Sequence, residues 1–166
     1  MSTIDLRAFL HLLEERGELV RVTEPVSPHL EMAALADRAV KEGGPALLFE
    51  NVVGHDIPVA MNLFGTARRT AWALGVEDLN DVTERLRDLL DVRLGGGLMG
   101  MMSNLPKLAE VRSLPPRRVR TAPVQRRVLV GDDVDLTRLP VLTTWPKDAG
   151  PFITLPVVIT RDPVQG

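Results

Sequence analysis

Apolar residues recur at helical spacing in several stretches of the chain, and short apolar runs lie between them. The first stretch predicts a helix that Asp5 caps and Gly17 ends, with Ile4 placed to pack on an apolar face made by Leu6, Phe9, Leu10 and Leu13. A short strand at Leu19–Val22 follows. Ser27 as N-cap and Pro28 at the first helical position predict a second helix, which continues through Lys41 and ends at Gly43-Gly44.

Two apolar runs then indicate strands at residues 46–49 and 57–61, joined by the turn-forming residues 51–56. Two more helices are expected after them. The first is capped by Thr66 and closed by Gly75, and the second covers about residues 78–91 with apolar positions at Leu79, Val82, Leu86 and Leu89. Together these elements predict an α/β layer in which helices pack on a small sheet.

The second half of the chain differs in composition. Residues 92–123 are rich in Gly, Met, Pro and Arg, which predicts a connector with one short helix near residues 105–112. We therefore expect an N-terminal α/β domain at residues 1–115, and a linker with the truncated start of a second domain at residues 116–166. Residues 157–160 predict a strand and Asp162-Pro163 a turn, so the chain stops at Gly166 before the pairing strand.

Pro156 lies inside the segment ITLPVVIT that contains this last strand, and proline is tolerated mainly at a sheet edge or a bulge because it has no N–H to donate. The missing partner strand would leave an apolar edge unpaired. We therefore expect the isolated chain to associate or to aggregate through the residues after about Pro123.

Composition narrows the functional classes. The 20 basic and 22 acidic residues nearly balance, which argues against a dedicated nucleic-acid binder. The absence of Cys excludes disulfides and thiolate sites, so packing alone must stabilise the fold. The N-terminus mixes charged with apolar residues and predicts neither a signal peptide nor a membrane span, so the cytoplasm is the expected location.

Three polar patterns invite a chemical interpretation, and each has a plainer alternative. His11, His29 and His55 lie on separate predicted elements, which favours surface or capping roles over a metal site. The glycines at 95–97 lack the Lys and Ser/Thr that complete a phosphate loop. Carboxylates at Asp132, Asp133 and Asp135 could bind Mg²⁺ or Mn²⁺, but the same residues after Gly131 suit a turn, and the turn is favoured.

A basic stretch could contact phosphate groups, and it consists of Arg117, Arg118, Arg120, Arg126 and Arg127. No aromatic residues lie among them to stack on bases, so a solvated linker or an interface is favoured. Trp72 is expected in the core. Trp145, in a turn-like segment, is either tucked under a neighbouring element or placed at an interface, and the sequence favours neither.

Five blocks in a fixed order carry a family resemblance that covers essentially the whole chain. They are DLRAFLHLLEERGELVRV, GGPALLFENV, MNLFGTARR, LPPRRVRTAPVQ and GDDVDLTRLPVLTTWPKDAGPFITLPVVITRDP. They resemble the N-terminal portion of UbiD-family decarboxylases of the 3-polyprenyl-4-hydroxybenzoate decarboxylase type, which use prenylated FMN. The resemblance implies an α/β domain, then a flavin-binding split β-barrel that is incomplete here, then a C-terminal domain involved in oligomerisation.

The implied activity is reversible decarboxylation of an aromatic or α,β-unsaturated carboxylic acid with prenylated FMN, with Mn²⁺ and K⁺ as implied ions. In the family pattern the metal ligands and the Glu-Arg-Glu set for proton transfer lie beyond the point that matches Gly166. No catalytic or metal-binding residue is therefore assigned in this chain. Thr154 is the one residue expected to line the cofactor pocket, with an ordinary strand residue as its plainer interpretation, and Trp145 is a weaker candidate.

Two functional hypotheses follow. In the first, the chain is the front of a UbiD-like carboxy-lyase that acts on a small carboxylic acid as a homo-oligomer, and the isolated 166 residues are inactive. In the second, it is a non-catalytic subunit or assembly module that pairs with a catalytic decarboxylase. Neither hypothesis involves nucleic acid or a membrane span.

Overall fold

The computed structural model describes residues 5–90, 119–162 and 164, and the side chains of the first range through residue 87. Its helices are α1 (Leu6–Glu15), α2 (Glu31–Lys41), α3 (Ala67–Ala73) and α4 (Leu79–Leu90), and its strands are β1 (Leu19–Val22), β2 (Ala46–Phe49) and β3 (Val59–Met61). Short 3-10 helices follow at Pro123–Arg126, Gly131–Asp133 and Leu136–Arg138. Expectations for Ile4, the glycines at 95–97 and the helix near residues 105–112 fall outside the described residues.

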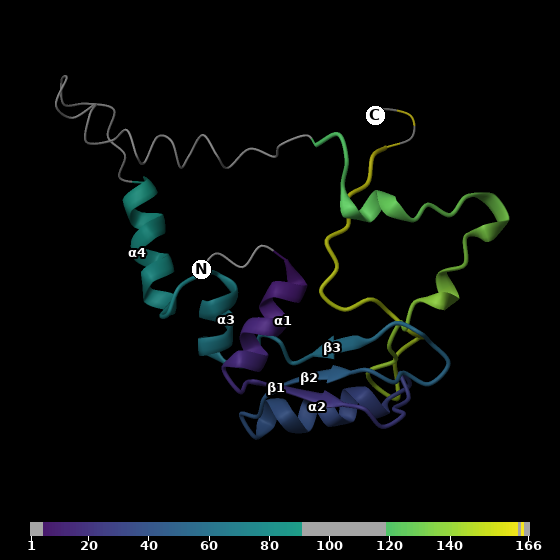
Figure 1. Cartoon of the computed structure of the whole chain (residues 1–166), viewed down its shortest axis with the longest axis horizontal. Coiled ribbons are helices and arrows are strands. Elements are labelled where there is room, and N and C mark those ends of the chain that lie inside the picture. The colour runs from purple at the N-terminus through teal and green to yellow at the C-terminus, as the bar shows by residue number, and fades with distance from the viewer. Residues whose placement is uncertain (1–4, 91–118, 163, 165–166) are drawn as a thin grey trace.

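The three strands form one mixed sheet with β2 at its centre. β1 pairs with β2 in parallel, with Leu19 opposite Ala46, and β2 pairs with β3 antiparallel, with Leu47 opposite Met61. Figure 1 shows α2 on one face of the sheet and α1 and α3 on the other. Because both faces are covered, every residue of β2 is buried, which is typical of a central strand in an α/β layer.

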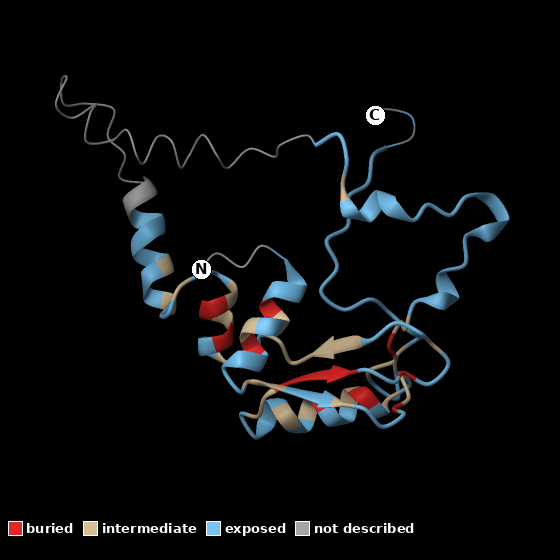
Figure 2. Ribbon diagram, in the orientation of Figure 1, coloured by how far each residue is buried: buried red, intermediate tan, exposed pale blue. Residues whose placement is uncertain are grey.

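The core therefore has two parts, one on each face of β2. On the α2 side, Leu47 and Phe49 pack with Met32, and on the other side Ala46 packs with residues of α1 and α3. This alternation follows from the two-residue period of a strand. Figure 2 shows the buried residues gathered on β2 and the helices that face it, whereas residues 119–139 are exposed almost throughout.

Capping residues and glycines in the sequence predicted most helix ends correctly. The Asp5 carboxylate accepts a hydrogen bond from the Ala8 amide at 2.9 Å, and Gly17 follows α1 with a φ of 67°. The Thr66 hydroxyl accepts one from the Arg69 amide at 3.2 Å at the start of α3. The predicted caps are thereby confirmed, as is the last predicted helix, which the structure places at Leu79–Leu90.

The predicted start of α2 is wrong by three residues. The helix begins at Glu31, and Leu30 before it has a φ of 66°, outside the helical region. The Leu30 amide donates to the Thr143 carbonyl at 2.9 Å, and the Thr143 amide donates to the Pro28 carbonyl at 3.2 Å. The backbone of residues 28–30 is thus hydrogen-bonded to Thr143 and cannot form the first helical turn. The hydroxyl of Ser27, the predicted cap, accepts from the His29 amide instead.

Two predicted strands also differ. β3 covers Val59–Met61 instead of 57–61, because Val59 already lies opposite Phe49, the last residue of β2. Residues 157–160 belong to no strand in the described structure, and Val157 and Ile159 are 88% and 89% exposed. A strand requires a neighbour that completes its backbone hydrogen bonds, and the described residues supply none here. The described residues do not show the expected start of a split barrel, since the pairing within residues 119–162 is limited to an isolated bridge between Leu142 and Phe152.

A buried ion pair joins Glu18, the residue before β1, to Arg69 of α3. Arg69 is 0% exposed, and its Nη1 donates to Oε2 of Glu18 at 2.7 Å while its Nη2 donates to the carbonyl of Asn62 at 3.2 Å. Asn62 has a φ of 56° and donates from its amide to the carbonyls of Gly44 and Pro45. The MNLFGTARR block is thus a structural clamp that ties α3 to the edge of the sheet.

Candidate functional site

The segment 139–154 docks on the α/β domain near the start of α2. Its anchor is Leu142, which is 6% exposed and joins the core cluster of Met32, Leu47 and Phe49. The backbone of Thr143 pairs with that of His29 and so holds the segment on the domain, and a second pairing, between Leu142 and Phe152, lies within the segment. The docking brings the later part of the chain against the end of β3.

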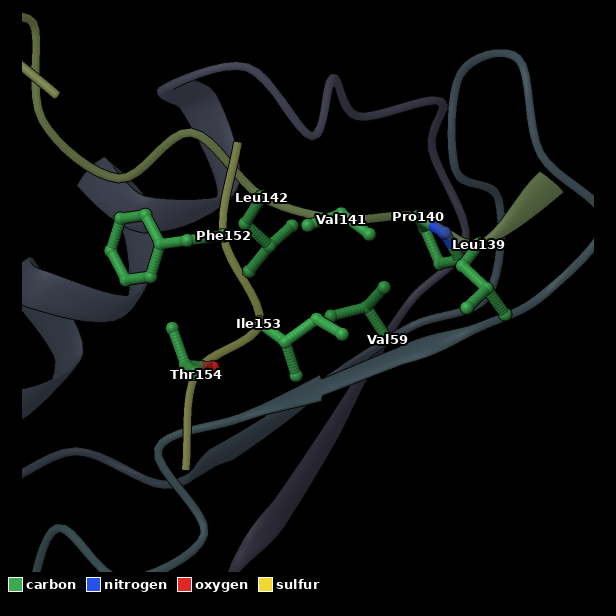
Figure 3. A pocket seen from close by; sticks show the side chains of 8 residues that line it. All are labelled: Val59, Leu139, Pro140, Val141, Leu142, Phe152, Ile153 and Thr154. Atoms are coloured by element: carbon green, nitrogen blue, oxygen red, sulfur yellow. The ribbon is translucent and has the colours of Figure 1, made fainter. Parts of the chain in front are cut away.

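A cavity of about 220 Å³ lies at this junction and contains the predicted site residue. Its lining comes from β3 and from the docked segment, and consists of Val59, Leu139, Pro140, Val141, Leu142, Phe152, Ile153 and Thr154 (Figure 3). Thr154 lies at one end of this row and supplies its single side-chain hydroxyl. The lining carries no ionisable side chain, so these residues can position an apolar ligand face and donate or accept one hydrogen bond.

Trp145 lies on a loop that one carboxylate holds in shape. Oδ2 of Asp148 accepts from the Thr144 amide at 3.2 Å, the Thr144 hydroxyl at 3.0 Å and the Trp145 amide at 2.8 Å. The indole is 60% exposed and lines a groove of about 420 Å³ with residues of α2, among them Ala33 and Val40. The structure therefore places Trp145 at the surface beside α2 and not under it.

The acidic residues of the later segment form turns, as the favoured interpretation predicts. Asp132 and Asp133 lie in the 3-10 helix Gly131–Asp133, and Asp135 accepts from the amide and the hydroxyl of Thr137 at 2.9 and 2.6 Å. These hydrogen bonds lower the pKa of Asp135. Among the described residues, no group of three or more His, Cys, Asp or Glu side chains could hold a metal ion.

Trp72 is buried in the core, which confirms its predicted role. Its indole N–H donates to Oε2 of Glu77 at 3.0 Å, and the guanidinium of Arg16 lies 4.3 Å from the centre of its ring. Arg16 also binds Glu77 through both terminal nitrogens, and these hydrogen bonds lower the pKa of Glu77 to about 2. The cluster fastens the end of α1 to the turn between α3 and α4.

Two family models match the chain. The model described as the 3-octaprenyl-4-hydroxybenzoate carboxy-lyase N-terminal domain matches residues 10–89, and the model of the Rift-related domain of the same carboxy-lyase matches residues 117–166. The chain belongs to the UbiD family. The resemblance seen in the five sequence blocks is thereby confirmed.

Solved structures of UbiD-class enzymes are similar to the chain. An evolved dimeric form of HmfF from Pelotomaculum thermopropionicum, in complex with prFMN, is 31% identical with a TM-score of 0.68, over 97% of this chain and 33% of that one. HmfF in complex with FMN is 32% identical with a TM-score of 0.63, over 88% and 28%. The open form of vanillic acid decarboxylase from Sedimentibacter hydroxybenzoicus is 27% identical with a TM-score of 0.66, over 90% and 30%.

The chain thus spans about a third of the length of these UbiD-class relatives. No helix in the described part of the chain is long and apolar enough to cross a membrane. The cavity beside Thr154 is too small to hold a flavin by itself. Its volume of about 220 Å³ is below the roughly 300–1,000 Å³ of ligand pockets, and its lining has no charge that could hold a phosphate group.

Proposed function

We propose that the chain is the N-terminal part of a UbiD-like carboxy-lyase, which catalyses the reversible non-oxidative decarboxylation of an aromatic or α,β-unsaturated carboxylic acid with prenylated FMN. Membership of the family supports the reaction class. The observation that carries the assignment of a site is the docking of residues 139–154 against β3, because it forms an apolar cavity with a single hydroxyl at Thr154.

In this proposal the α/β domain is a scaffold and Thr154 is a binding residue. Its hydroxyl hydrogen-bonds a polar edge of the flavin or the substrate, and apolar neighbours such as Ile153 exclude water from that side. Prenylated FMN, when bound, supplies the electron sink for decarboxylation. Mn²⁺ and K⁺ would be held by residues outside this chain, so the 166 residues alone are expected to be inactive.

The proposed enzyme is a cytoplasmic homo-oligomer. The exposed apolar run that includes Val157 and Ile159 supports association, because such a run is costly to leave in water. In the proposed homo-oligomer, another copy of the chain would cover this run.

The test begins with the coding DNA that follows the Gly166 codon. If the frame continues, the full product is expressed with prenylated FMN and assayed for CO₂ release from a panel of aromatic and α,β-unsaturated acids. We expect release by the full product and none by residues 1–166 alone. A continuing frame whose flavin-loaded product releases no CO₂ from any acid contradicts the proposal.

The role of Thr154 is tested in the same product by replacing it with Val, which keeps the shape and removes the hydroxyl. Loss of one hydrogen bond is expected to weaken flavin or substrate binding roughly fivefold, corresponding to about 1 kcal/mol. Thr121→Val, at an exposed position outside the cavity, is the matched control. Equal binding by the two variants would remove Thr154 from the site.

A stop codon directly after Gly166, with recovery of a full-length decarboxylase in a pull-down, would instead favour the assembly-module hypothesis.

A further inference from the structure

A second cavity of about 400 Å³ lies beside the Thr154 cavity and differs from it in chemistry. It forms where the loop before β3 meets the segment 127–139, and Leu139 lines both cavities. Its ionisable lining residues are His55, Asp56, Arg127, Asp135 and Arg138. Chain segments more than 70 residues apart therefore contribute charged side chains to one hollow.

Neither arginine of this hollow forms an ion pair with a carboxylate among the described residues, although the charge of Arg138 helps to lower the pKa of Asp135. Arg16, Arg21 and Arg69 of the α/β domain each form an ion pair, whereas neither Arg127 nor Arg138 lies within 4.0 Å of a described carboxylate oxygen. A guanidinium presents several N–H donors in a planar fork that matches the oxygens of an oxyanion. Two such forks at one cavity form a suitable anion-binding pair.

The neighbouring groups define how strong that site can be. Oδ1 of Asp135 accepts from the Thr137 amide and hydroxyl, and the negative charge of this carboxylate opposes an incoming anion. His55 contacts the carbonyl of Arg138 through Nδ1 at 3.4 Å, which links the loop to the arginine-bearing segment. Asp56 is exposed at the rim, and its negative charge opposes an incoming anion.

We propose that the cavity formed by His55, Arg127 and Arg138, here called the arginine pocket, binds a small oxyanion through its two guanidinium groups. The ligand is a phosphate or a carboxylate group, because these are the groups that a guanidinium fork contacts in pairs. The proposal goes beyond the decarboxylase activity and requires neither flavin nor metal. Its test is therefore independent of the proposed function.

The probe is inorganic phosphate, added to the full chain at constant ionic strength while the amide signals of Gly54 and His55 are followed by NMR. We expect a saturable shift in the millimolar range. Arg127→Gln and Arg138→Gln should each weaken binding about tenfold, the loss typical of one charge-assisted contact. Arg126→Gln, one residue away and outside the pocket, should leave the affinity unchanged.

Asp56→Asn separates a specific site from general damage, because it removes a repelling charge and should tighten phosphate binding. A parallel titration with acetate distinguishes the two sources of the oxyanion, and stronger saturation by one of them assigns the ligand. A shift that does not saturate, or an equal loss of affinity in Arg126→Gln, would show only unspecific charge attraction and overturn the proposal. Weaker binding by Asp56→Asn would contradict it as well.

Discussion

Replacing Glu18 by Gln is expected to destabilise the α/β domain much more than the loss of an exposed ion pair. Arg69 is 0% exposed, and Glu18 is its charged partner at 2.7 Å. The carbonyl of Asn62 accepts from the same guanidinium at 3.2 Å but carries no full charge. The substitution therefore leaves a buried cation without a counter-ion, which costs more than the pair itself contributes.

The size of the effect follows from this geometry. Removing one partner of a buried ion pair costs about 3–5 kcal/mol. Glu18→Gln should fall at the lower end, about 3 kcal/mol, because the Gln oxygen and the Asn62 carbonyl still accept hydrogen bonds. Domains of this size are stable by about 5–15 kcal/mol, so a large share of the stability would be lost.

Urea unfolding, followed by circular dichroism and tryptophan fluorescence, measures the loss. With a slope of about 2 kcal/mol/M, a loss of 3 kcal/mol lowers the midpoint by roughly 1.5 M. Glu14→Gln is the matched control, because its pair with Arg21 is exposed and should contribute less than about 1 kcal/mol. Adding Arg69→Met to Glu18→Gln should recover stability by removing the orphaned charge. Equal midpoints for the two single variants would refute the reasoning.

Three further changes test other parts of the structure. Gly65→Ala should lower the free energy of unfolding by about 1–3 kcal/mol, since the new Cβ would lie 1.7 Å from Oδ1 of Asn62. Gly150→Ala is the control, because its Cβ meets open space and should leave the urea midpoint unchanged. Leu142→Ala should cost about 2–5 kcal/mol in that assay, and an unchanged midpoint would mean that the docked segment adds nothing to the core. The pKa of Glu77 is lowered from 4.5 to about 2, so its ionised form contributes stability above pH 4.5 that is lost as the pH falls towards 2. Thermal unfolding from pH 2 to 6 should show a flatter profile for Glu77→Gln, and parallel profiles would contradict this assignment.

Elements determined by nearby residues could be predicted from the sequence. The caps at Asp5 and Thr66 follow from the hydrogen bonds that a side chain can make within one helical turn. The start of α2 could not be predicted, because a carbonyl 113 positions away accepts the Leu30 amide. The same holds for residues 157–160, whose β-branched composition favours a strand but whose partner is not among the described residues.

The residues of the candidate sites also fall into those that the sequence could predict and those that it could not. Thr154 was reached through the family resemblance, and its apolar cavity depends on the contact between β3 and the docked segment. The arginine pocket could not be predicted, because sequence spacing does not indicate that His55 meets Arg138. The only hint of an anion-binding site in the sequence is its arginine-rich stretch. Composition alone cannot show whether such arginines line a pocket or lie on a surface exposed to solvent.

The docked segment also determines how the two matched regions relate to each other. Leu142 belongs to the region that the Rift-related model matches, yet it packs among Met32, Leu47 and Phe49 of the region that the N-terminal model matches. A buried side chain shared in this way fixes the position of residues 139–154 relative to the sheet, because displacing it would open a cavity in the core. Leu142 therefore ties the segment that carries Thr154 to the α/β domain itself. A scaffold of this kind suits a binding site, which requires its contact groups to be held in place before the ligand arrives.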